Sequence, residues 1–175
     1  MAASHFRQDH MKTIGLLSDT HGYLDPEIWK YFDGCDEIWH AGDFGNVRIS
    51  EALSSRKPLR GVYGNIDGAQ LRLLHPQVLV FSVEGVKVMM VHIGGKPGRY
   101  AAGIEKTIRE EHPGLFICGH SHITKAMNDP VNKLLYLNPG AAGKEGFHTV
   151  RTAMRFTLNA GRTGNLEVIE LGRRS

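Results

Sequence analysis

Long apolar runs are missing from this sequence. The longest apolar stretch, Val86 to Ile93, is interrupted by two polar residues and falls well short of the roughly 18 residues that a membrane-spanning helix needs. The opening segment MAASHFRQDH lacks the apolar centre of a signal peptide. We therefore expect a cytoplasmic protein. Residues 1–11 are interpreted as a disordered leader, with Met11 as an alternative to Met1 as the natural start.

Cysteine and clustered charge are also scarce. Only Cys35 and Cys118 are present, and their spacing does not match CxxC, so free buried thiols are expected rather than a zinc finger or a disulfide framework. The formal net charge is +3, but the basic residues are scattered, and no basic stripe with interleaved aromatics indicates a nucleic-acid interface. Histidine is the exception in this ordinary composition: there are ten, and histidine is the commonest metal ligand.

Short apolar segments alternate with helical segments along the first two thirds of the chain. Strands are expected at 13–18, 37–40, 59–63, 78–83, 86–91 and 115–118, and helices at 26–32, 47–55 and 99–111. The last third indicates further strands at 124–128, 134–138, 153–159 and 166–171. No linker or repeat interrupts residues 12–175, which are expected to form one domain. The order of elements favours an α/β fold in which two packed sheets carry helices on the outside.

Five of the expected strands end in a polar cluster. The clusters read SDTHG (18–22), AGDFGN (41–46), GNID (64–67), VHIGG (91–95) and GHSH (119–122). Ligand sites in α/β folds form beyond the carboxyl ends of strands, so these clusters can converge on one crevice. Asp19 and His21 are two residues apart, as are His120 and His122, and extended residues two apart point to the same side.

The donors in these clusters predict a metal centre. They are Asp19, His21, Asp43, Asn65, His92, His120 and His122. This mixture of imidazole nitrogen with carboxylate and amide oxygen suits Mn, Zn, Fe or Ni better than Mg or Ca alone. Seven donors are too many for one tetrahedral ion, but they are about right for two ions that share a carboxylate. Each motif alone is weak, and it is their ordered occurrence at strand ends that predicts the site.

The motif set resembles the calcineurin-like metallophosphoesterase family, whose pattern is DxH, GD, GNH[DE], a later His and GHxH. The resemblance runs from about Lys12 to Gly140. The short length and the NPG at 138–140 are most similar to the small phosphodiesterase branch of that family (YfcE-type). The resemblance implies a four-layer αββα sandwich of two mixed β-sheets flanked by helices.

The same resemblance implies a role for each donor. One metal would take Asp19, His21, Asp43 and His122, and the other would take Asp43, Asn65, His92 and His120. The ions would be divalent, with manganese favoured and Zn, Ni, Fe or Mg as alternatives. A hydroxide bridging them would attack phosphorus in line. Asp43, Asn65 and His92 would be the catalytic residues. The expected substrate is a small phosphodiester or a nucleotide-like molecule.

One position departs from the family pattern. Ile66 stands where GNH[DE] has its histidine, which is credited with contacting the phosphate and protonating the leaving group. Isoleucine can do neither, so general-acid help worth roughly 10²- to 10⁴-fold is expected to be absent and good leaving groups to be favoured. His75 and His148 are conceivable substitutes, although surface histidines are the simpler interpretation. Asp67 is expected in a turn or beside a ligand.

Three other residues near the motifs are assigned supporting roles. His40 is a candidate to orient a metal ligand. Trp29 and Trp39 are expected in the core rather than under a substrate. Because no segment is long enough for a cap domain, specificity has to come from short loops such as 94–100 and 138–147.

Two other functions stay open. The family includes a small retromer subunit that keeps most of the metal-binding pattern, lacks the same histidine and works by docking partners, so a protein-interaction scaffold is an alternative. A phosphatase for one specific monoester is another. Exposed strand edges in the C-terminal β region would permit a homodimer.

Overall fold

The computed structural model describes residues 11–174, in which two five-stranded β-sheets face each other. Sheet I has the order β12-β11-β1-β2-β3, with bounds β1 (Lys12–Leu17), β2 (Glu37–His40), β3 (Leu59–Gly61), β11 (Val150–Asn159) and β12 (Arg162–Arg173). Sheet II has the order β4-β5-β8-β10-β9, with bounds β4 (Val78–Val83), β5 (Val86–Val91), β8 (Leu115–Ile117), β9 (Thr124–Asp129) and β10 (Leu134–Pro139).

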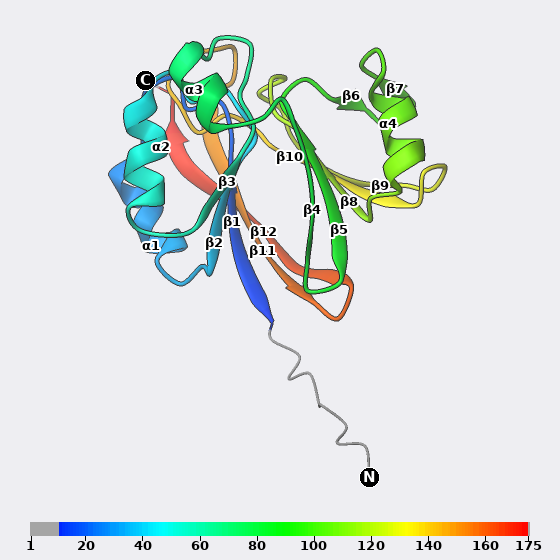
Figure 1. Ribbon diagram of the computed structural model, residues 1–175. Coiled ribbons are helices and arrows are strands. Elements are labelled where there is room, and N and C mark those ends of the chain that lie inside the picture. The colour runs from blue at the N-terminus through cyan, green and yellow to red at the C-terminus, as the bar shows by residue number, and fades with distance from the viewer. Residues whose placement is uncertain (1–10, 175) are drawn as a thin grey trace.

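Helices cover the outer faces of the two sheets (Figure 1). Helices α1 (Trp29–Phe32) and α2 (Val47–Ser54) pack on sheet I through a buried cluster that includes Phe32 and Leu53. Helix α4 (Ile104–Glu111) packs on sheet II through Ile108 and Phe116. The expected α/β fold, a sandwich of two mixed sheets with helices outside, is therefore confirmed.

The core between the sheets is apolar and centred on Trp39. This side chain is fully buried, and its ring meets Phe81 and Phe156 edge to face, with centroids 4.9 Å and 5.7 Å apart. Trp29, the first residue of α1, is partly buried and packs against the second apolar cluster, which lies between sheet I and helices α1 and α2. Both tryptophans lie in packed apolar clusters, as expected, and so do the free, buried thiols of Cys35 and Cys118.

Strand direction determines where the functional loops go. β1, β2 and β3 run parallel, so their carboxyl ends lie at one edge of sheet I. β5, β8 and β10 run parallel in sheet II. The loops that follow these strands carry the polar clusters predicted from the sequence, and they meet at one end of the sandwich (Figure 1).

The structure corrects the predicted helix over 99–111. Its first residues form β7 (Arg99–Tyr100), which pairs with β6 (Gly95–Lys96) in a small hairpin. The helix begins only at Ile104, because Gly103 takes a left-handed backbone with φ +81° that a helix cannot continue through.

Other elements also differ from expectation. The segment over 26–32 starts as a 3-10 turn, η1 (Pro26–Ile28), in which Asp25 caps the Glu27 N–H at 2.9 Å, and then becomes α1. Helix α3 (Ala69–Leu74) was not predicted. β12 starts at Arg162, which shortens the turn expected over 160–165.

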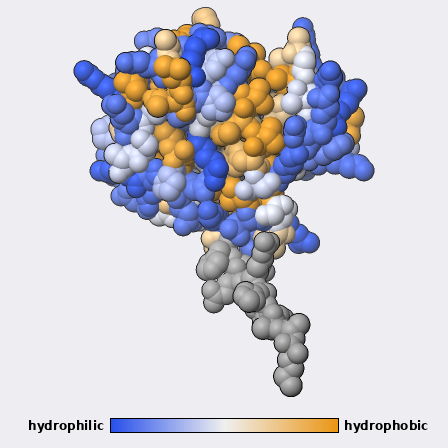
Figure 2. Space-filling view, in the orientation of Figure 1, coloured by the Kyte–Doolittle hydropathy of each residue, from blue (hydrophilic) through white to orange (hydrophobic). Residues whose placement is uncertain are grey.

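The strand edges and the ends of the chain bear on the remaining predictions. β9 and β12 both lie at sheet edges, as the homodimer prediction requires. Edge strand β4 is more apolar than β9 and β12, and apolar side chains gather over β4 and β5 (Figure 2).

Within residues 11–174, no helix is long and apolar enough to cross a bilayer. The leader expected over 1–11 lies outside the described residues except for Met11, and one domain over 12–175 stays a prediction.

Candidate metal centre

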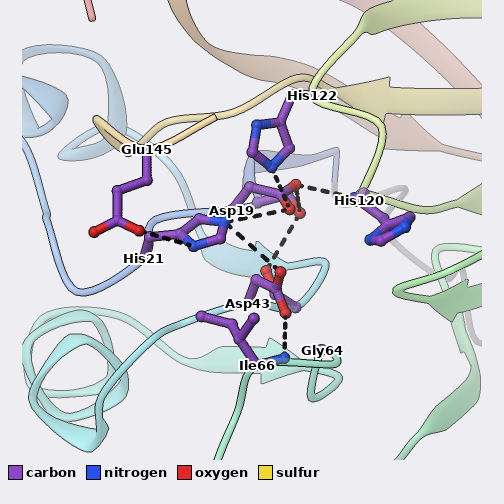
Figure 3. Close-up of polar contacts among 12 residues, drawn as sticks. Asp19, His21, Asp43, Gly64, Ile66, His120, His122 and Glu145 are labelled. Carbon is purple, nitrogen blue, oxygen red and sulfur yellow. Dashed lines mark hydrogen bonds and ion pairs between the residues drawn. The ribbon is translucent and has the colours of Figure 1, made fainter. Parts of the chain in front are cut away.

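All seven predicted donors lie together where the loops meet. Sheet I supplies Asp19 and His21 after β1, Asp43 after β2 and Asn65 after β3, while sheet II supplies His92 after β5 and His120 and His122 after β8. The carboxylates of Asp19 and Asp43 point toward each other, with imidazoles around them (Figure 3). Two groups of donors stand out, Asp19 with His21 and His122, and Asp43 with His92 and His120. In each group the ligand atoms lie within 4.8 Å of one another.

The first group surrounds one oxygen of Asp19. Asp19 Oδ1 is 3.3 Å from His122 Nε2 and 4.0 Å from His21 Nε2. The other oxygen, Oδ2, accepts hydrogen bonds from the Ser18 hydroxyl (2.6 Å) and the His120 backbone N–H (3.1 Å). Asp19 Oδ1 and His21 Nε2 are buried, and neither has a hydrogen-bond partner among the described residues.

The second group is centred on His92 Nε2. This nitrogen is 3.2 Å from Asp43 Oδ2 and 3.1 Å from Asn65 Oδ1. On the other side of the ring, His92 Nδ1–H donates to the carbonyl of Ala41 at 2.8 Å, which leaves Nε2 facing the two oxygens. Asp43 lies within reach of both groups, because its Oδ2 is also 3.6 Å from His21 Nε2.

These distances fit metal coordination. Ligands that hold one ion at about 2.0–2.2 Å stand roughly 3–3.5 Å from each other. The shortest carboxylate-to-imidazole separation in each group, 3.3 Å and 3.2 Å, lies in this range, and the remaining separations are at most 4.8 Å. An imidazole lone pair facing carboxylate oxygens is repulsive unless a cation or a proton lies between them. The orphaned Asp19 Oδ1 and His21 Nε2 have the same requirement. The donor set therefore fits cations at both groups.

The backbone around the donors is strained. Five donors adopt a left-handed conformation that is uncommon for residues with a side chain: Asp19 (φ +53°), His21 (+47°), Asp43 (+58°), His120 (+66°) and His122 (+57°). Such strain is typical of functional sites, where the surrounding structure compensates for it. Gly64 belongs to that structure, because a Cβ there would lie only 1.9 Å from Asp43 Oδ1.

Electrostatics keep the Asp43 carboxyl ionised. Burial raises its pKa, but the hydrogen bond with His92 and the backbone N–H of Ile66 outweigh burial and leave the pKa below its ordinary value. For His92, burial lowers the pKa, but Asp43 and Asp19 outweigh it and raise the pKa above the usual value. Both shifts have the same origin, which is close contact between a carboxylate and an imidazole in a buried site.

Comparison with known proteins identifies the family. A profile of the calcineurin-like phosphoesterase superfamily domain matches residues 11–161. The chain belongs to this superfamily. A relative from Methanocaldococcus jannaschii, named as a probable metallophosphoesterase, is 28% identical over 137 residues, which cover 73% of this chain and 67% of the relative. The family implies divalent metal ions, and the two groups of donors are the candidate places for them.

Solved structures agree on the fold. A novel archaeal phosphodiesterase superposes with a TM-score of 0.68 at 21% identity, over 91% of this chain and 99% of that one. The Vps29 of Entamoeba histolytica, solved with zinc, superposes with a TM-score of 0.69 at 14% identity, over 93% of this chain and 99% of that one. Both a phosphodiesterase and a Vps29 protein therefore share the fold of this chain.

Two buried residues hold the loops of the candidate metal centre in register. Asp67 accepts from the backbone N–H groups of Phe44, Gly45 and Gly64, which joins the loop after β3 to the loop that carries Asp43. His40 Nδ1 accepts from the Gly42 N–H at 3.2 Å, and its Nε2 bonds Thr20 Oγ1 at 3.0 Å. Burial holds the pKa of His40 well below its usual value, so the ring is neutral. His40 orients loops and touches no predicted ligand side chain directly.

The residues considered as substitutes for the missing acid histidine are placed differently. Ile66 is about half exposed beside Asp43, and its backbone N–H donates to Asp43 Oδ1 at 3.2 Å (Figure 3). His75 is buried rather than on the surface, stacked on Phe44 and bonded to the Ser50 hydroxyl. His148 lies against His122, with ring centroids 5.2 Å apart, and its Nε2 donates to the carbonyl of Gly143.

Two contributors were missed at the sequence level. The Ser18 hydroxyl orients Asp19, and its place directly before the DxH motif was the available signal. Glu145 lies 3.9 Å from His21 Nδ1, on the side of the ring away from the carboxylates. It belongs to the loop over 138–147 that was expected to set specificity, but nothing in its spacing pointed to His21.

Proposed function

We propose that the protein is a phosphodiesterase that uses two divalent metal ions, with manganese favoured, on a small phosphodiester or nucleotide-like substrate. The observation that carries the proposal is the position of Asp43 between two groups of donors. Its Oδ2 is 3.2 Å from His92 Nε2 in one group and 3.6 Å from His21 Nε2 in the other. One carboxylate shared by two donor groups is what a pair of ions requires.

When bound, the two ions would lower the pKa of a water molecule and neutralise negative charge on the phosphate. The chain's own residues prepare the site for this. Asp43 is held ionised, and its second oxygen is fixed by the Ile66 N–H. The Ala41 carbonyl fixes the tautomer of His92, so that Nε2 faces inward as a donor. Asn65 presents its amide oxygen beside that nitrogen, at the exposed rim.

The absence of an acid at position 66 supports a diester with a good leaving group. Hydrolysis breaks one P–O bond, and the departing oxygen must end with a proton. No histidine stands at Ile66 to supply it. His148, the candidate nearest the donors, already donates its Nε2–H to Gly143. A phenol or another weakly basic alcohol leaves without such help, whereas a simple alkoxide does not.

The test is turnover of bis-p-nitrophenyl phosphate against p-nitrophenyl phosphate, with Mn²⁺ added to metal-stripped protein. We expect metal-dependent hydrolysis of the diester and a smaller rate on the monoester. Asp43→Ala should reduce diester turnover to below about 1% of wild type, because both groups lose a donor. Asp33→Ala, at an exposed aspartate paired only with Arg56, is the matched control and should keep full activity. Diester turnover that survives Asp43→Ala would contradict the proposal.

A non-catalytic scaffold is the second candidate, and exposed apolar side chains favour it. Three residues next to donors in sequence carry large apolar groups in solvent: Ile66 (47% exposed), Ile93 (46%) and Ile123 (64%). Phe147, in the loop over 138–147, is fully exposed as well. Exposed apolar groups of this kind are common at protein interfaces. Stoichiometric metal binding without turnover of either ester, with any divalent ion tried, would favour the scaffold over the enzyme.

A further inference from the structure

A pocket of about 470 Å³ opens beside His120. It lies between the loop after β5 and the strands β9 and β10, and its lining residues include Tyr136 and Gly119. A volume of this size lies within the range of small-molecule sites. Because His120 belongs to the second donor group and also lines the pocket, a molecule held at the metal centre can extend into it.

Three basic side chains line this pocket. Lys96 and Arg99 come from the β6–β7 hairpin, and Lys125 comes from β9. We call the site lined by these three residues the cationic pocket. No aspartate or glutamate is among the residues that line it. Within residues 11–174, none of the three basic side chains forms an ion pair.

The hairpin places two of these charges in opposition. Lys96 and Arg99 are direct cross-strand partners, on either side of a turn made by Pro97 and Gly98. Like charges directly opposite each other in a strand pair are destabilising. Gly98 has φ +80°, as the third residue of a Pro-Gly type II turn requires, so the turn holds the two basic residues side by side. A bound anion would offset their repulsion.

Two tyrosines that line the pocket are held in place by hydrogen bonds. The Tyr136 hydroxyl donates to the Gly95 carbonyl at 2.8 Å, which ties the hairpin to sheet II. The Tyr100 hydroxyl donates to Asp129 at 2.6 Å, and its ring packs edge to face on Phe116. Both hydroxyls are therefore committed to the protein, and the tyrosines offer the pocket only ring surface. The polar side chains left for a ligand are the three cations together with His120 and Ser121.

We propose that the cationic pocket binds a second phosphate group, carried on one arm of the phosphodiester whose reacting phosphate lies at the metal centre. The inference rests on the proposed phosphodiesterase function and narrows its substrate class to diesters that bear a further phosphate. Lys96 and Arg99 from the hairpin and Lys125 from β9 would donate hydrogen bonds to its oxygens. The isoleucine and tyrosine surfaces of the same pocket would contact the organic part of the arm.

The test compares two substrates that differ only in this phosphate. One is the p-nitrophenyl ester of thymidine 5′-phosphate, and the other is the same ester with an additional 3′-phosphate. Wild type should show a kcat/KM about tenfold or more higher for the second, because charge-assisted hydrogen bonds form to the extra group. In the triple variant Lys96→Gln, Arg99→Gln, Lys125→Gln, the ratio of the two kcat/KM values should fall to about one.

The matched control removes the same number of positive charges elsewhere. Lys30→Gln, Lys106→Gln, Arg109→Gln changes exposed basic residues that already pair with Glu27, Glu110 and Glu105, and it should keep the wild-type ratio. The wild-type preference should also shrink as salt is raised, because the three pocket cations face solvent. A wild-type ratio of one, or a preference that the pocket variant retains, would overturn the inference.

Binding separates failure of this inference from failure of the proposed function. Isothermal titration with thymidine 3′,5′-bisphosphate and with thymidine 5′-phosphate needs no turnover. If wild type binds the bisphosphate more tightly and the pocket variant does not, while neither ester is hydrolysed with any divalent metal, the pocket stands and the catalytic proposal fails. Equal affinity for the two ligands in wild type would overturn the pocket whatever the activity.

Discussion

Ile66 contributes its backbone to the site and leaves its side chain at the rim. The N–H of Ile66 donates to Asp43 Oδ1, so the residue helps to fix the shared carboxylate whatever its side chain is. The side chain itself is about half exposed and takes part in none of the hydrogen bonds of the donor groups. The identity of the side chain can therefore change without removing the contact to Asp43, which makes this position suitable for testing the missing acid.

Ile66→His should raise activity toward p-nitrophenyl phosphate more than toward bis-p-nitrophenyl phosphate. An imidazolium at the rim can donate a proton to the departing oxygen and contact the extra charge of a monoester. We expect a gain in monoester kcat/KM of about tenfold, below the roughly 10²- to 10⁴-fold of an evolved general acid. The measurement is the monoester-to-diester ratio of kcat/KM as a function of pH. The gain should be lost at high pH, where the new histidine is neutral.

Ile66→Gln is the control for that substitution. Glutamine can donate a hydrogen bond to phosphate but cannot release a proton near neutral pH. The monoester-to-diester ratio of kcat/KM in Ile66→Gln should therefore be the same at high pH and at low pH. If Ile66→His leaves the monoester-to-diester ratio of wild type unchanged, the interpretation of position 66 as a missing acid is wrong.

At the residue scale, donor identity was readable from the sequence and donor conformation was not. Asp19, His21 and Asp43 stand in short motifs whose chemistry is visible in the letters. Their assignment as ligands stays a prediction, although the structure brings them together. The same residues adopt a left-handed backbone, and contacts distant in sequence hold them, such as the bond from the His120 N–H to the Asp19 carboxylate, across 101 positions of sequence. No local pattern encodes such a contact.

Among the elements, strand β2 is joined to both of its neighbours by one carboxylate. Glu37 begins this strand, is buried, and accepts from Lys12 of β1 and Arg60 of β3, each at 2.8 Å. The indole N–H of Trp39 donates to the same carboxylate at 3.0 Å. Glu37 thus bonds to residues on three adjacent strands of sheet I.

Glu37→Gln should destabilise the fold by about 2–3 kcal/mol at neutral pH. Burial raises the pKa of Glu37, but the hydrogen bonds from Arg60, Lys12 and Trp39 outweigh it and lower the pKa from 4.5 to about 2. A folded-state pKa below the unfolded value means that the stabilisation is complete above about pH 4.5 and is lost as the pH falls toward 2. The free energy of unfolding, from urea titrations at pH 7 and pH 3, measures both effects.

The control for this prediction is an exposed carboxylate of the same sheet. Glu167→Gln removes a pair with Arg155 that is largely in solvent and should change stability by less than about 1 kcal/mol. The difference in stability between wild type and Glu37→Gln should narrow at pH 3. A difference that stays constant between pH 7 and pH 3 would show that the carboxylate charge of Glu37 is not what stabilises the sheet.

Elements with a clear period were predicted well, and short or irregular ones were not. β2, β4 and β5 have the predicted bounds, because each is an apolar run with a clear end. α3 was missed because six residues are too few to show a helical period. The helix over 99–111 was extended too far forward, because the apolar spacing of Tyr100 fits a helix equally well. In the structure Tyr100 belongs to strand β7, and the hairpin that contains β7 is held by contacts with sheet II.

For the molecule as a whole, the candidate metal centre draws its donors from both sheets. The first donor group combines Asp19 and His21 from sheet I with His122 from sheet II. The second combines Asp43 from sheet I with His92 and His120 from sheet II. Any ion held by either group would therefore add a link between loops that are already joined by hydrogen bonds such as His92 to Ala41 and His120 to Asp19. The unfolded chain cannot hold the donors at these separations, so binding energy adds to folding stability.

Mn²⁺ should accordingly raise the melting temperature of metal-stripped protein, and a chelator should reverse the rise. At an ion concentration about 100 times the Kd, binding stabilises by about 2.7 kcal/mol, which for a chain of this size corresponds to roughly 5–10 °C. Asp43→Asn keeps the shape of the side chain but removes the charge that both groups share, so the rise should be largely lost. Asp33→Asn, an exposed aspartate outside the site, should show the full rise and serves as the control. An equal rise in wild type and Asp43→Asn would mean that manganese binds elsewhere, because an ion held by either donor group should depend on the Asp43 carboxylate.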